Sequence, residues 1–217
     1  MTSSRSSAFD FRHPWFIGGA LLLTTVVLDL GLHPVGGPIA GGVLTVVIFA
    51  AALLVFALGI RGTGSVTARR PLGTVALILL AAWILVELVV TDVISSGMSG
   101  DAIPQSLLVL GYVDPFLRFA LTLIAVIQIG RTGIVPRPWN WAPAWALGAL
   151  TVPWLLGQAL IVVGIPPEAQ TAAFLAVGAV DGTVRATCAV VIGVLAILLA
   201  DRSSSAQPDP LRATPAE

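Results

Sequence analysis

Six long apolar stretches alternate along the chain with short segments rich in glycine, proline and serine. The stretches cover residues 15–33, 38–59, 72–97, 107–130, 141–163 and 171–200. A stretch of about 20 apolar residues crosses the hydrocarbon core as a helix, because only a helix satisfies its own backbone groups there. The pattern therefore predicts an all-α integral membrane protein with six transmembrane helices in one domain, residues 15–200.

The composition supports this class and excludes several others. Hydrophobic residues make up 57% of the 217 residues and charged residues only 10%, whereas soluble domains carry roughly 25% charged residues. The net charge is zero, so no basic surface suits nucleic acid. With a single cysteine, Cys188, the chain has no intrachain disulfide and no thiolate cluster. We expect no metal and no cofactor.

The eleven basic residues are all arginine, and their positions predict the orientation. Nine lie before the first span, after the last, or in two of the loops between spans; the other two lie inside spans. Since arginine accumulates in cytoplasmic loops, both termini are predicted to be cytoplasmic in a multi-pass protein of the cell membrane. Residues 1–14 would form a cytoplasmic segment and residues 201–217, rich in serine, proline and alanine, a disordered cytoplasmic tail. A cleaved signal peptide is the alternative interpretation of the first apolar stretch.

Landmarks recur along the sequence at a nearly constant spacing. Trp83 and Glu87 recur in the second half of the chain as Trp154 and Gln158, and the pair Asp114 and Arg118 recurs at a similar interval as Asp181 and Arg185. The loop sequence after residue 61 is likewise echoed after residue 131. We interpret the domain as three repeated helical hairpins in the same orientation, about 15–59, 72–130 and 141–200.

Polar residues inside apolar spans are costly and therefore indicate function. At a rise of about 1.5 Å per residue, all of them lie between the bilayer midplane and the exterior, whereas the cytoplasmic half of each span is almost purely apolar. The distribution predicts a polar cavity open to the outside. The ionisable residues are Asp29, Glu87, Asp92, Asp114, Arg118, Asp181 and Arg185, with Gln158 and Tyr112 as uncharged companions.

The two Asp-x-x-x-Arg sequences place each carboxylate one helical turn from its guanidinium. Each pair either neutralises itself for structural reasons or contributes to a binding site. Glu87 has no basic residue within a turn, so it reaches Arg118 or Arg185 across the bundle or it is neutral. Asp29 and Asp92 lie near the outer ends of their spans, where water can hydrate them.

Two function classes fit these features. The first is binding or transport of a small solute, with binding residues Trp83, Glu87, Tyr112, Asp114, Arg118, Trp154, Gln158, Asp181 and Arg185. Six helices, both ends inside and an outer-half site resemble, in layout alone, the substrate-binding subunits of energy-coupling-factor vitamin transporters.

The second class is an integral-membrane enzyme acting on an isoprenoid or another lipid. Glu87 or Asp92 would be the catalytic general acid, and Trp83 and Trp154 would stabilise positive charge through their ring faces. This arrangement is similar in layout to small membrane-bound terpene cyclases. An accessory subunit of a membrane complex is a third possibility. The expected partners are the lipid bilayer, a small solute or lipid-like ligand, and a second copy or a larger membrane complex.

Overall fold

The computed structural model describes residues 12–32, 37–59, 65, 70–96, 105–132, 139–164 and 166–205. This part of the chain is helical almost throughout, as the apolar pattern predicts. Its elements are α2 (Arg12–Leu32), α3 (Gly37–Leu58), α4 (Pro71–Ser96), α5 (Gln105–Thr132), the short 3₁₀ turn η1 (Trp139–Trp141), α6 (Ala142–Val163) and α7 (Pro167–Ser205).

The helices follow the six apolar stretches, and most of their ends agree within a few residues. The exception is α7, which begins at Pro167 and runs to Ser205, into the segment predicted as a tail. By length and hydropathy, α2, α4, α5, α6 and α7 could each cross a membrane, while α3 contains the shorter apolar segment Gly42–Leu58. The chain is therefore a polytopic membrane protein.

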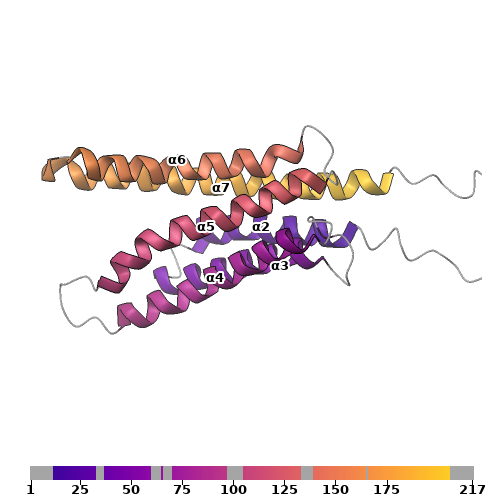
Figure 1. Ribbon diagram of the computed structural model, residues 1–217, viewed down its shortest axis with the longest axis horizontal. Helices are drawn as coiled ribbons and strands as arrows, with labels where there is room; N and C mark the ends of the chain where they lie inside the picture. The colour runs from indigo at the N-terminus through magenta and orange to yellow at the C-terminus, as the bar shows by residue number, and fades with distance from the viewer. Residues whose placement is uncertain are drawn as a thin grey trace, which may run out of the picture.

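The six helices form a ring in chain order. The helix α2 packs against both α3 and α7, so the first and last described helices lie side by side. Further contacts join α3 to α4, α4 to α5 and α6 to α7, whereas α5 and α6 touch only sparingly. Figure 1 shows α6 and α7 running together along one side, with the beginning of α5 well apart from both. The ring is closed between α2 and α7 and is loosest between α5 and α6.

The contact between α2 and α7 depends on two glycines. A Cβ atom added to Gly19 would lie 2.6 Å from the carbonyl oxygen of Gly193, and one added to Gly193 would lie 3.0 Å from the carbonyl oxygen of Gly19. Because neither residue has a side chain, the two backbones come into direct contact. Small residues allow such close approach between membrane helices, where dispersion rather than the hydrophobic effect favours association.

The buried core lies toward the end of the bundle that carries Arg70 and Arg131. Ala57, Ala76, Leu77 and Ala125 form a cluster that joins α3, α4 and α5. In the described part of the chain, every buried apolar side chain lies at the middle of its helix or on this arginine-bearing side. The opposite halves of the helices expose large apolar side chains, which suits contact with lipid.

Glycines with positive φ end two of the helices. Gly59 follows α3 with a φ of 70° and Gly164 follows α6 with a φ of 67°, the left-handed conformation that commonly terminates helices. The hydroxyl of Ser65 donates a hydrogen bond to the carbonyl oxygen of Ala57, 2.7 Å away. This contact satisfies a carbonyl at the end of α3 that has no partner within the helix.

Candidate functional site

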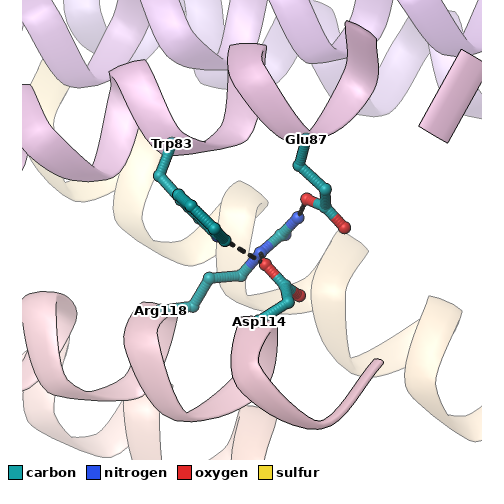
Figure 2. A network of polar contacts seen from close by, with 4 residues as sticks. All are labelled: Trp83, Glu87, Asp114 and Arg118. Carbon is teal, nitrogen blue, oxygen red and sulfur yellow. Dashed lines mark hydrogen bonds and ion pairs between the residues drawn. The ribbon is translucent and has the colours of Figure 1, made fainter. Parts of the chain in front are cut away.

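The polar residues of α4 and α5 meet because these neighbouring helices run antiparallel. Trp83 and Glu87 are one turn apart on α4, and Asp114 and Arg118 are one turn apart on α5. Residues separated by four positions share a helix face. Figure 2 shows that the four side chains point toward one another between the two helices.

Arg118 is the centre of this four-residue network. Its Nε atom donates to Oδ1 of Asp114 at 2.6 Å, and its Nη2 atom donates to Oε2 of Glu87 across the helix interface. The indole nitrogen of Trp83 donates to the same Oδ1 atom of Asp114 at 2.8 Å. The expected pair of Asp114 with Arg118 on the same helix is confirmed. Of the alternatives that the sequence left open for Glu87, the structure shows the contact with Arg118.

Two carboxylates therefore share one guanidinium, and the network carries surplus negative charge. The side chains of Arg118, Glu87 and Asp114 are 32%, 24% and 16% exposed, so most of their hydration is lost. Charge-assisted hydrogen bonds replace part of that hydration. Pro115 has no N–H group, so the carbonyl oxygen of Gly111, one turn earlier, lacks its usual helical hydrogen bond. This carbonyl oxygen is a further polar group in the span.

The second ion pair has the same spacing but a different environment. Nε of Arg185 donates to Oδ2 of Asp181 at 2.6 Å, which confirms the same-helix pair. The Arg185 side chain is 62% exposed and that of Asp181 is 30% exposed. Among the described residues, Asp181 is the one hydrogen-bond partner of Arg185, whereas Arg118 has two carboxylate partners.

The two ion pairs lie at similar depth. Arg118 is about 20 Å along α5 from Arg131, at about 1.5 Å per residue. Gly193 packs beside Gly19, which puts Arg185 about 22 Å from the level of Arg12 by the same count. The charge of Arg185 also acts electrostatically on both Asp114 and Arg118. We call Trp83, Glu87, Asp114, Arg118, Asp181 and Arg185 the polar layer.

The contacts between α6 and α7 fix where the remaining candidate on α6, Gln158, lies. Gly157 packs near Val177, and the Cys188 thiol lies 3.9 Å from the carbonyl oxygen of Ala146. Both contacts give the same antiparallel register, in which Asp181 is level with residue 153. Gln158 is five residues farther along α6. It is therefore not beside Arg185 in the way that Glu87 is beside Arg118.

The other candidate residues lie on α2, α4, α5 and α6, some of them at the depth of the polar layer. Trp154 packs edge-to-face on Phe116 of α5, with ring centroids 5.6 Å apart and planes at 80°. Tyr112 is exposed, and Asp92 is exposed near the end of α4. Asp29 is exposed on α2, and the contact of Gly19 with Gly193 places it level with residue 183 of α7, at the depth of Asp181 and Arg185.

Sequence reasoning missed two contacts in this region. It treated Trp83 as an aromatic lining residue, whereas its N–H group holds Asp114. The sequence signal that could have indicated this contact was the position of Trp83 one turn before Glu87. It also missed Phe116, the residue that links α5 to α6 through Trp154, and nothing in an apolar span distinguishes one phenylalanine from another.

The described residues include no group of three histidine, cysteine or acidic side chains able to hold a metal ion. Comparison with known proteins finds no family model, no curated protein and no solved structure that matches this chain. The charged groups of the polar layer can form ion pairs and hydrogen bonds with ions and polar molecules.

Proposed function

We propose that this membrane protein binds a small polar solute at the polar layer and carries it across the bilayer. The observation that carries the proposal is that two groups of charged side chains, Glu87, Asp114 and Arg118 on α4 and α5 and Asp181 and Arg185 on α7, lie at similar depth in an otherwise apolar bundle. The bundle is densely packed toward the arginine-bearing end and exposed toward the other. This asymmetry supports access to the polar layer from one side of the membrane.

A purely structural role explains the polar layer less well. Ion pairs that only neutralise each other would balance their charges, but here three carboxylates accompany two guanidiniums. Arg185 is also 62% exposed. Even the mildest insertion scale assigns an arginine at the centre of a lipid-facing helix a cost of about 2.5–3.5 kcal/mol. Water or a bound solute beside Arg185 avoids that cost.

The lipid-modifying enzyme is the second candidate. It needs a carboxylic acid that can donate a proton, and Glu87 and Asp92 are its candidates. Glu87 contacts the guanidinium of Arg118, and an adjacent positive charge favours the ionised carboxylate over the proton-donating acid. Asp92 lies exposed toward the end of α4. The ion pair at Glu87 therefore favours solute binding over acid catalysis.

We also propose that the arginine-bearing end of the bundle faces the cytoplasm. Reporter domains fused after Arg202, or in the loop near Arg69, should then report a cytoplasmic location, and a fusion at Gly100 should report an external one. The physical reason is the accumulation of arginine on the cytoplasmic side. A cytoplasmic signal from the Gly100 fusion would overturn both the orientation and the six-span topology.

The proposed function is tested by identifying what the protein retains. Wild-type protein and the Glu87→Gln variant are purified in a mild detergent, and bound small molecules are identified by mass spectrometry. We expect the wild type to retain a polar solute. The variant should fold, because Arg118 keeps Asp114 as its partner, but should retain at least about tenfold less, the equivalent of about 1.4 kcal/mol.

Glu168→Gln is the matched control, because this acid is exposed in the first turn of α7 and lies outside the polar layer. It should retain the solute as the wild type does. Recovery of an isoprenoid instead of a polar solute would support the enzyme. Recovery of bulk phospholipid alone from the wild type would contradict both candidates and leave the accessory subunit.

A further inference from the structure

Arg118 and Arg185 have the same local sequence relation to an aspartate but different amounts of free hydrogen-bonding capacity. A guanidinium has five N–H donors arranged in a fork. Arg118 uses Nε and Nη2 for two carboxylates. Arg185 uses Nε for Asp181, and within the described residues its two Nη nitrogens have no hydrogen-bond partner. The outer edge of Arg185 is therefore open to a ligand.

Helical periodicity places Arg185 on the side of α7 that faces the other helices. On α7, Val177 and Cys188 contact α6, while Gly193 and Ala196 contact α2. At about 100° per residue, Arg185 projects between these two faces, which is the side of α7 directed toward the interior of the ring.

In the described part of the chain, neither neighbouring helix forms an ion pair with Arg185. Asp29 of α2 is level with residue 183 of α7 in the register set by Gly19 and Gly193, but no hydrogen bond or ion pair joins it to Arg185. In the register of α6 and α7, the residues level with Asp181 are Pro153 and Trp154, both without charge. On α4, by contrast, Glu87 approaches Arg118. A carboxylate carried by a ligand would fill at Arg185 the role that Glu87 fills at Arg118, and bidentate contact with a guanidinium is the strong geometry for such a group.

The network around Arg118 provides the complementary charge. Glu87 and Asp114 share a single guanidinium, so surplus negative charge lies at a depth similar to that of Arg185. A simple anion bound to Arg185 would be repelled by that charge. A ligand that also carries a positive group would be attracted by it, since opposite charges interact strongly where water is scarce.

We propose that Arg185 binds the oxyanion of a small zwitterion, whose cationic end lies toward Glu87 and Asp114. This inference rests on the proposed function and specifies its solute class. The same chemistry occurs in free solutes with a carboxylate and a quaternary ammonium group and in zwitterionic phospholipid headgroups. Arg118 is then a structural counter-ion and Arg185 the ligand-binding arginine.

Arginine labelling tests this assignment. Purified protein in maltoside detergent is treated with 4-hydroxyphenylglyoxal, which modifies accessible guanidinium groups, and each arginine is followed by peptide mass spectrometry. We expect Arg185 to react several-fold faster than Arg118. Glycine betaine, a zwitterion inert to the reagent, should slow the labelling of Arg185 several-fold, and more than acetate or tetramethylammonium at equal concentration. In Glu87→Gln, the advantage of betaine over acetate should shrink because the surplus charge is gone.

Protection by betaine identifies a soluble zwitterion as the ligand class. Protection by phosphatidylcholine in mixed micelles, without protection by betaine, assigns the same site to a lipid headgroup and contradicts the small polar solute of the proposed function. Equal labelling of Arg118 and Arg185, or labelling of Arg185 that neither compound slows, would overturn the inference. A retained solute without charge in the mass-spectrometric survey, combined with an unprotected Arg185, would leave the proposed function intact and refute only this assignment.

Discussion

Replacing Arg118 by glutamine should strongly destabilise the bundle. The substitution leaves Glu87 and Asp114, whose side chains are 24% and 16% exposed, facing each other without their counter-ion. Removing one partner of a buried ion pair costs about 3–5 kcal/mol, and here two carboxylates lose the same partner. We expect a large fall in the midpoint of thermal unfolding in detergent, followed by circular dichroism.

The second ion pair provides the matched control for this prediction. Arg185→Gln removes a guanidinium that is 62% exposed and leaves a single carboxylate, Asp181, whose side chain is 30% exposed, so the unfolding midpoint should fall much less than in Arg118→Gln. The combination of Arg118→Gln with Glu87→Gln and Asp114→Asn should recover much of the lost stability. It removes the unpaired charges and keeps an acceptor for Trp83. Equal midpoints for Arg118→Gln and Arg185→Gln would contradict the assigned roles.

The second large effect is expected at the contact between α2 and α7. In Gly19→Ala, the new methyl group would lie 2.6 Å from the carbonyl oxygen of Gly193. A backbone atom cannot rotate away as a side chain can, so the two helices must separate. Overpacking typically costs about 1–3 kcal/mol. This cost exceeds the intrinsic gain of about 0.5–1 kcal/mol for replacing a helical glycine by alanine.

Two other glycines separate the packing effect from helix propensity. Gly148 has no neighbouring atom within 4 Å, so Gly148→Ala should stabilise the helix slightly. At Gly18, the added methyl group would meet the Phe56 ring at 2.7 Å, and that ring can move, so an intermediate effect is expected. Thermal unfolding should therefore rank Gly19→Ala lowest and Gly148→Ala highest. A Gly19→Ala variant as stable as Gly148→Ala would show that the two helices are not in close contact.

The sequence alone determined which segments are helical and which polar groups pair within a helix. Apolar stretches this long leave the backbone no partners but its own, so the helix positions follow without tertiary information. A four-residue spacing likewise places Asp114 beside Arg118 and Asp181 beside Arg185 for any helix. These predictions depend on local geometry alone, and the structure confirms them.

The tertiary structure decided everything that depends on the relative position of two helices. From the sequence, Glu87 could form an ion pair with Arg118 or with Arg185, or it could be a neutral carboxylic acid. The packing of α4 on α5 pairs it with Arg118. The repeat suggested that Gln158 corresponds to Glu87, but the register of α6 on α7 places Gln158 farther along. Helices that are apolar on nearly every side offer many similar packing faces. Their register is therefore set by contacts between distant residues, such as Gly19 with Gly193, which no local pattern encodes.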